Sequence, residues 1–286
     1  MKKNLSYFPL YLFISVFLSL TLSAHGQNRS EETDSLRFVG TVWKEKQIRK
    51  GILWRSAHIK ELFGSTQSIQ IIEADLRRVR KKIRLAALAD GLKKTSSFAE
   101  EAGAEVGING GFFDMKNGGA VDFIKVDGKI INETRTLSTR GNAVFVFSRK
   151  KVLIAPAKDS LLLYEKYPNV LLAGPLLMQK RELLPLDSNA FNKNRHPRSA
   201  VALTKDKLIL ITVDGRNANA QGMSLYELGQ ILKWYGAEEA MNLDGGGSTS
   251  LYIRGQTPNG IVNFPSDNKK FDHEGERSVA NTLLIR

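Results

Sequence analysis

The chain has 286 residues, a net charge of +13 and no cysteine. Without cysteine it has no disulfide bond, no cysteine-based metal site and no thiol nucleophile. A chain of this length can bury a full hydrophobic core and fits one large domain, or one domain with an appendage. Its stability must therefore come from packing.

The first 26 residues have the pattern of a secretory signal peptide. Lys2 and Lys3 precede an almost wholly apolar run from Leu5 to Leu22, and small residues lead to a cleavage site near Gly26. An uncleaved membrane anchor is the alternative, although the run is borderline in length for a bilayer. We therefore expect an exported protein, periplasmic, cell-surface or secreted, whose mature chain keeps a charge of +11 once the two lysines are removed from the +13.

The remaining chain shows no tandem repeat and no internal linker. We expect a polar N-terminal segment at 27–50, with disorder over 27–35, and one folded domain at 51–286.

Six basic residues gather between Arg77 and Arg84, between two strand-like runs. This position indicates a solvated turn. A basic exported protein meets acidic polymers and anionic membrane surfaces. Nucleic-acid binding is the alternative, but no aromatic residue is interleaved with the cluster and no nucleic-acid motif accompanies it, so no nucleic-acid partner is expected.

Short apolar runs separated by turn residues predict strands paired as hairpins. The predicted elements are strands at 68–76, 83–89 and 280–285, and hairpins around Asp127-Gly128, Arg149-Lys150 and Lys205-Asp206. Repeated hairpins indicate antiparallel pairing. We therefore expect a single domain of mixed α/β (α+β) class, with a largely antiparallel sheet and packed helices.

Two segments carry helix start signals. Ser97 and Glu100 have the spacing of a capping box, with Gly103 as a stop signal. Ser224 and Glu227 repeat that spacing ahead of LGQILKWYG, whose apolar residues fall near one face. The second helix is expected to pack on a sheet.

The most informative stretch is AMNLDGGGSTSLYI, residues 240–253. An apolar run ends in Asp244, and Gly245, Gly246, Gly247 and Ser248 follow. Three consecutive glycines weaken a fold through lost chain entropy, unless the backbone must pass close to a ligand or expose its N–H groups. The pattern favours a polar binding or catalytic loop over a plain tight turn.

Other segments also join glycine, asparagine or charge to the end of an apolar run. An arginine that precedes a strand after a proline can hold a phosphate through two parallel hydrogen bonds. The segments are GINGGFFD with Asn109 and Gly110, AGPLL, RHPRSAVAL with His196 and Arg198, VDGRNANAQGMS with Asp214 and Arg216, and EGERSVANTLLI with Glu276 and Arg277. Each also has a plainer structural reading: a turn, a surface histidine for His196, or an exposed ion pair for the last.

The four histidines show no zinc spacing, and neither a P-loop nor a dinucleotide fingerprint is present. A divalent cation held by carboxylates stays open. No other cofactor is predicted.

Together these motifs resemble the phosphodiester glycosidase family. INGGFF, GPLL, HPRSAVAL, VDGR, NLDGGGSTS, VNFPS and ERSVANTLL follow one another as in that family, over roughly 51–286. The resemblance implies a mixed α/β catalytic domain that removes a sugar from a phosphate at the anomeric carbon; in the animal member the sugar is N-acetylglucosamine. The matching positions are Asn109, Arg198, Asp214, Arg216, Asn242, Asp244, Gly245, Gly246, Gly247, Ser248, Glu276 and Arg277, while Ser199 stands where threonine is usual.

The mechanism expected from these residues is hydrolysis of a glycosyl phosphodiester. Arg198 is the first candidate for the phosphate, followed by Arg216 or Arg277. Asp244 or Asp214 would act as nucleophile or as base for water, and their spacing would bear on retention or inversion. The third carboxylate of the set, Glu276, would orient a sugar hydroxyl or an arginine.

Two other functions fit the same residues. The first is a phosphodiesterase that breaks the P–O bond, and the second is a non-catalytic binder of anionic envelope polysaccharide. The sugar and the group beyond the phosphate stay open in every case.

Overall fold

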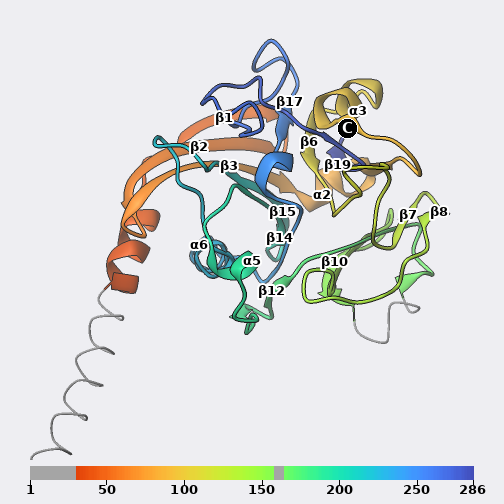
Figure 1. Cartoon of the computed structure of the whole chain (residues 1–286), viewed down its shortest axis with the longest axis horizontal. Helices are drawn as coiled ribbons and strands as arrows, with labels where there is room; N and C mark the ends of the chain where they lie inside the picture. Colours follow the sequence, from red (N-terminus) through yellow and green to blue (C-terminus); the bar gives the residue numbers. More distant parts are fainter. Residues whose placement is uncertain (1–29, 158–163) are drawn as a thin grey trace, which may run out of the picture.

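The computed structural model describes residues 30–157 and 164–286, and the expected signal peptide lies outside them. Three larger sheets and one two-stranded sheet form the framework, and every strand ladder among them is antiparallel. This confirms the predicted mixed class with largely antiparallel pairing (Figure 1). Within the described residues, no helix is long and apolar enough to cross a membrane.

The largest sheet has eight strands and carries most of the segments singled out in the sequence. Along the sheet the order is β1 (Lys44–Arg49), β2 (Ile52–Leu62), β3 (Ser65–Asp75), β15 (Lys207–Val213), β14 (Arg198–Leu203), β16 (Glu239–Asn242), β12 (Leu176–Gln179) and β13 (Glu182–Leu183). Alternate residues of its central strands enter two different cores, as the pleat requires. In β15, Leu208 and Leu210 face one core, and Ile209 and Ile211 face the other.

The two middle-sized sheets close over the first of these cores. One has the order β10 (Val152–Pro156), β9 (Ala143–Phe147), β11 (Asn169–Ala173), β7 (Ile124–Val126) and β8 (Lys129–Asn132); the other has β17 (Leu251–Ile253), β6 (Val106–Asn109), β19 (Asn281–Ile285) and β4 (Ile83–Ala87); the small sheet pairs β18 (Ser278–Val279) with β5 (Lys93–Lys94). Ile72, Ile108, Phe145 and Leu283 are all buried in one cluster, so the three larger sheets share a core. The predicted strands and all three predicted hairpins are confirmed.

Helix α6 (Leu225–Trp234) covers the second core and is the principal helix of the fold. Ser224 caps it: the hydroxyl accepts from the Glu227 N–H while the Glu227 carboxylate accepts from the Ser224 N–H, so the predicted capping box is confirmed. Its buried face packs against β12, β13 and β16 and joins the core that Ile209 and Ile211 enter. The short helices are α2 (Leu76–Val79), η1 (Arg80–Lys82), α5 (Ala190–Lys193) and η2 (Gly246–Ser248).

The start of helix α3 (Thr95–Glu101) differs from the prediction. Ser97 lies inside the helix and does not cap it. The cap comes instead from a residue distant in sequence: the Glu276 carboxylate accepts from the Ser96 N–H at 2.8 Å and from the Ser96 hydroxyl at 2.6 Å. The carboxylate of Glu276 therefore takes the place of the predicted serine cap, because a carboxylate binds the free N–H groups of a helix start more strongly than a hydroxyl does.

Residues 30–39 are also helical, so the expectation of disorder over 27–35 is wrong for its described part. The helix docks through Phe38, whose ring lies 5.7 Å from that of Trp43 and 6.0 Å from that of Trp234. The Asp34 carboxylate accepts from the Phe63 N–H at 2.8 Å. The burial of Phe38 therefore holds this polar segment against the folded domain, although its composition alone predicts disorder.

The ends of several strands meet at one place, where the candidate residues follow. Register pairs Arg198 with Val213 across β14 and β15, and Ala200 with Asn242 across β14 and β16. The Asp244 N–H donates to the Gly110 carbonyl at 2.9 Å, which ties the end of β16 to the end of β6. Segments far apart in the chain therefore lie side by side.

The two serines proposed as caps give a direct test of this reading of the helices. Ser224→Ala should lower the free energy of unfolding by about 1 kcal/mol, because the cap of α6 is lost. Ser97→Ala should change it by less than about 0.5 kcal/mol, since that hydroxyl caps nothing. Urea unfolding followed by circular dichroism measures both, and equal losses would contradict the assignment.

Candidate functional site

The glycine triplet after β16 is the centre of the candidate site. Its turn is fixed by backbone hydrogen bonds: the Gly246 N–H donates to the Pro197 carbonyl at 2.8 Å, and the Ser248 N–H donates to the Gly245 carbonyl at 3.2 Å. Gly246 has a φ of +62°, which L side chains rarely adopt. The turn is therefore anchored to the segment that leads into β14.

Each of the three glycines has a close neighbour at the place where a Cβ would lie. A Cβ on Gly245 would lie 2.7 Å from the Pro197 carbonyl oxygen, and one on Gly246 would lie 2.9 Å from Nη2 of Arg216. A Cβ on Gly247 would overlap the guanidinium of Arg277 and the carboxylate that pairs with it, Asp267. The missing side chains make room for two arginines from different segments to lie on the loop.

Asp244 is the carboxylate that this loop presents, and it is partly exposed. Burial raises its pKa to about 6, which outweighs the opposing effects of Ser248, the Gly245 N–H, Arg277 and Arg140. The Gly245 N–H donates to Oδ1 of Asp244 at 3.0 Å. A carboxyl with this pKa exchanges its proton close to neutral pH, as an acid, base or nucleophile in a site must.

Three arginines with accessible surface lie around the glycine turn, and two of them, Arg277 and Arg140, act electrostatically on Asp244. Arg216 is exposed, has a φ of +61°, and lies against Gly246. Arg277 donates from Nε to Oδ2 of Asp267 at 3.0 Å and acts electrostatically on Asp244. Arg140 lies with its guanidinium carbon 4.5 Å from the centre of the Phe191 ring. This much positive charge next to a glycine turn suits an anionic ligand.

Arg198, the first candidate for the phosphate, is held inside the protein. Its side chain is 1% exposed. Nε donates to the Met223 carbonyl at 2.8 Å, and Nη2 donates to the carbonyls of Phe191 and Asn194 at 2.7 and 2.8 Å. Burial lowers its pKa to about 10. Arg198 therefore ties α5 and the start of α6 to the site, and it leaves the exposed face of the loop to Arg216 and Arg277.

Asp214 is fully buried beside the loop. Its Oδ2 accepts from the Ser68 hydroxyl at 2.6 Å, and its Oδ1 accepts from the Phe264 N–H at 2.8 Å and from Asn263 Nδ2 at 3.1 Å. Burial raises its pKa, and these donors oppose the rise. The carboxylate joins three segments around the site and is turned away from solvent.

Glu276 is not directed at the glycine triplet. Its carboxylate is bound to Ser96 at the start of α3, as described above, and the residue is 8% exposed. Burial raises its pKa. Its chain neighbour Arg277 reaches the loop, so the two residues of this motif point to different parts of the fold.

Two buried asparagines set the backbone of the loop. Asn109 Nδ2 donates to the Asp244 carbonyl at 2.6 Å, while its Oδ1 accepts from the Ser199 hydroxyl at 2.7 Å and the Ser250 N–H at 3.1 Å. Asn242 Nδ2 donates to the Gly174 carbonyl at 2.8 Å. The hydroxyl of Ser248 is buried next to Asp244, where it opposes the rise in the pKa of that carboxyl.

Three residues at the site, Arg140, Asp267 and Asp122, were not selected from the sequence. Arg140 and Asp267 lie in polar stretches without a motif, and Asp122 follows an ordinary apolar–polar alternation. Burial raises the pKa of Asp122 to about 6, and its carboxylate lies next to Gly141, the neighbour of Arg140. His196, read as a surface residue, is half-buried, and burial together with Arg198 and Arg216 lowers its pKa.

The described residues hold no group of three or more His, Cys, Asp or Glu side chains arranged to bind a metal ion.

Comparison with known proteins decides the family. The sequence profile of phosphodiester glycosidases matches residues 102–286, well over half of the chain. The chain belongs to the phosphodiester glycosidase family. The residues that surround the glycine triplet all lie within the matched range, apart from Ser68 and Ser96, which support it from outside.

Similar proteins include members of this family from animals. The chain is 25% identical over 184 residues to mouse N-acetylglucosamine-1-phosphodiester alpha-N-acetylglucosaminidase, covering 59% of this chain and 35% of the mouse protein. The human protein of that name is 26% identical over 190 residues, again covering 59% of this chain and 35% of the relative. The chain thus spans about a third of the length of these relatives.

Solved structures share the fold. The catalytic domain of the zebrafish protein of the same name, auto-inhibited by its pro-peptide, has a TM-score of 0.65 at 23% identity, over 86% of this chain and 84% of that one. A hypothetical protein from Synechocystis has a TM-score of 0.64 at 18% identity, over 86% of this chain and 64% of that one.

The raised pKa of Asp244 predicts how stability depends on pH. The unfolded carboxyl ionises near its ordinary pKa of 3.8 and the folded one only near 6, so the free energy of unfolding falls as pH rises through this interval. Asp244→Asn removes that loss. The variant should match the wild type at pH 4 and have a higher melting temperature at pH 7.5, measured by differential scanning fluorimetry.

Asp114 serves as the matched control, because hydrogen bonds from the backbone and side chain of Asn117 lower its pKa. The stability it contributes is present above pH 4 and is lost as pH falls below that value. Asp114→Asn should therefore be less stable than the wild type at pH 7.5. A destabilised Asp244→Asn at pH 7.5 would overturn the assigned pKa.

Proposed function

We propose that this member of the family is a hydrolase that releases a sugar from a glycosyl 1-phosphodiester by cleaving the bond between the anomeric carbon and the phosphate oxygen. One observation carries the proposal: Asp244, with its pKa near 6, lies on a glycine turn against which Arg216 and Arg277 pack. A carboxylate for the sugar and cations for the phosphate are thereby within one site. N-acetylglucosamine, the sugar in the names of the animal relatives, is our first candidate.

In this proposal the phosphate binds to Arg216 and Arg277, which face the loop. The leaving phosphate already carries stable negative charge, so its departure depends more on charge neutralisation than on proton donation. Asp244, ionised above pH 6, acts on the anomeric carbon as nucleophile or activates water as base. The buried Asp214 and Arg198 act as positioning residues that hold the loop and its approach.

The part taken by Glu276 is likewise structural in this proposal. It fixes the start of α3 and, through the chain, the position of Arg277. Asp122 is the second carboxylate near the site with a pKa raised to about 6 and is our candidate for orienting a sugar hydroxyl or supplying a proton.

Asp244→Asn should lower kcat by at least about 1,000-fold on a sugar 1-phosphodiester while binding is kept, because the amide has the same shape but cannot ionise.

In the wild type, kcat/KM should fall about tenfold per pH unit below pH 6, where Asp244 gains its proton. Product release at several pH values measures both. A wild type without turnover on any glycosyl phosphate would favour the binding protein.

The position of the broken bond separates the hydrolase from a phosphodiesterase. Hydrolysis in oxygen-18 water should place the label in the released sugar, since water adds at the anomeric carbon. Mass spectrometry of the two products measures this, and label in the phosphate would show that the P–O bond is broken instead.

The accessible arginine can be tested separately from the buried one. Arg216→Ala should lower kcat/KM by about 100- to 1,000-fold, the usual loss for one donor to a developing anion, with little change in melting temperature because the side chain is exposed. Arg254→Ala, at an exposed arginine that pairs with Glu105, is the charge-matched control and should leave kcat/KM unchanged. Equal losses of kcat/KM in the two variants would show that Arg216 does not bind the substrate.

A further inference from the structure

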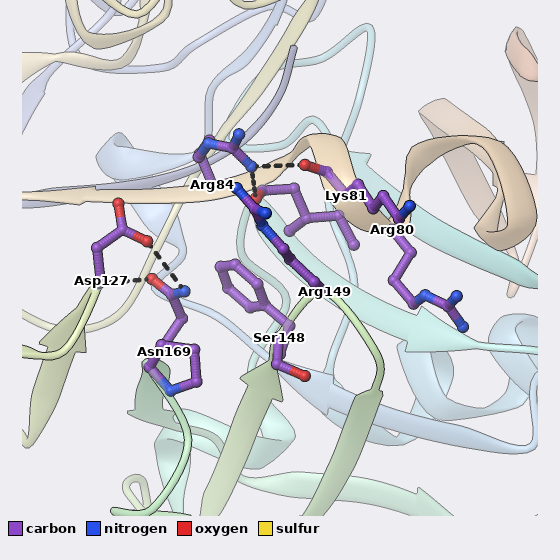
Figure 2. Close-up of a pocket in the computed structure, with 10 residues that line it drawn as sticks. Arg80, Lys81, Arg84, Asp127, Ser148, Arg149 and Asn169 are labelled. Carbon is purple, nitrogen blue, oxygen red and sulfur yellow. Dashed lines mark hydrogen bonds between the residues drawn. The ribbon is translucent and has the colours of Figure 1, made fainter.

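A basic pocket with a volume of about 390 Å³ lies away from the glycine triplet. Figure 2 shows its lining side chains around one hollow between the η1 turn and the turns that precede β8 and β10. The lining residues are Arg80, Lys81, Ile83, Arg84, Asp127, Phe147, Ser148, Arg149, Pro168 and Asn169. None of them was assigned to the site described above.

The pocket lies at the other end of strands β6 and β9 from Asp244. Ile83 at the pocket pairs with Ile285, which pairs with Val106 at the start of β6, and β6 reaches the site only at Asn109. The three-residue rise from Val106 to Asn109 along the extended strand β6 is about 10 Å. In the second sheet, Phe147 lies at the pocket, whereas the other end of β9 lies next to Gly174. The two sites are therefore distinct.

The cations of the pocket lack the ion pairs that most arginines of this protein have. Arg80, Lys81, Arg84 and Arg149 have no carboxylate within 4.0 Å among the residues described. The one carboxylate of the lining, Asp127, accepts from Asn169 Nδ2 at 3.3 Å. Unpaired like charges that line one pocket repel one another, so the arrangement favours an anion among them.

The other arginines without an ion pair in the described chain are at the glycine-triplet site, apart from the C-terminal Arg286. They are Arg140, Arg198 and Arg216. Arginines without an ion pair thus gather in two places, the pocket and the glycine-triplet site. The glycine-triplet site already suits a phosphate because of its glycine turn and its position next to Asp244.

Donors in the pocket are held in place and left free. Arg84 donates from Nη1 to the carbonyls of Lys81 and Ile83, both at 2.8 Å, which fixes its guanidinium and leaves its other N–H groups available. The Ser148 oxygen accepts from two backbone N–H groups, so its own proton is free to donate.

We propose that this pocket binds a phosphate group carried by a sugar or glycan, at a site separate from the one that contains Asp244. Guanidinium groups match the tetrahedral oxygens of phosphate, and a volume of this size leaves room for an attached sugar. The one aromatic residue of the lining, Phe147, is 2% exposed, so no ring is available to stack on a nucleic-acid base.

A residue-resolved NMR titration tests this without any turnover. Inorganic phosphate is the first probe, glucose 6-phosphate the second and a short single-stranded DNA the third. Lys81→Ala with Arg149→Ala removes two cations of the lining. Lys82→Ala with Lys150→Ala removes the same charge from the adjacent positions of the same turns, neither of which lines the pocket.

Saturable shifts are expected at the amides of residues 81–84 and 148–149 with both phosphate probes, and the sugar phosphate should bind at least as tightly. The first double variant should weaken this binding at least tenfold, and the second should change it less than about twofold. Resonances of the glycine triplet report the other site and should be unaffected by either pair. If the double variant does not fold, Arg149→Gln alone should still weaken binding by about threefold or more.

Equal losses in the two double variants would reduce the pocket to general electrostatic attraction and overturn the proposal. Shifts that do not saturate with either phosphate probe would do the same. Tighter binding of the DNA, with a steep dependence on salt, would assign the pocket to nucleic acid instead. None of these outcomes depends on the hydrolase activity, because the titration measures no product.

Discussion

The absence of three side chains, at Gly245, Gly246 and Gly247, is the constraint on which the candidate site depends. With those side chains missing, the Pro197 carbonyl can receive a backbone hydrogen bond, and the guanidinium groups of Arg216 and Arg277 can lie on the turn. Asp244 is placed directly before this turn. Ordering three glycines costs conformational entropy. Glycine-rich turns are nevertheless common at anion sites, because they let the backbone and charged side chains come close to the ligand.

Several buried charged residues around that turn hold neighbouring segments in position. Arg198 binds three backbone carbonyls, Asp214 binds three donors from two other segments, and Glu276 caps a helix remote in sequence. Buried charges are stable only when they are hydrogen-bonded, so each one fixes the segments that satisfy it. Asp244 differs from them because it is partly exposed and keeps a pKa near neutrality.

Much of the fold could be predicted because its signals are local. The capping box at Ser224 and the hairpin at Asp127-Gly128 need only neighbouring residues, and both are confirmed. The cap of α3 and the helix over 30–39 were predicted wrongly, since their partners, Glu276 and the aromatic group around Trp234, come from distant parts of the chain. No pattern within a short window contains such partners.

By itself, the sequence determined the class of the fold, the family and the motifs that gather at the site, because hydrophobic period, turn residues and motif order are properties of the linear chain. The tertiary structure alone decided which of the charged residues face solvent. Asp214 and Asp244 look equivalent as carboxylates at strand ends, as do Arg198 and Arg216 as arginines in loops. Burial separates them, and burial depends on which segments pack on top of each residue.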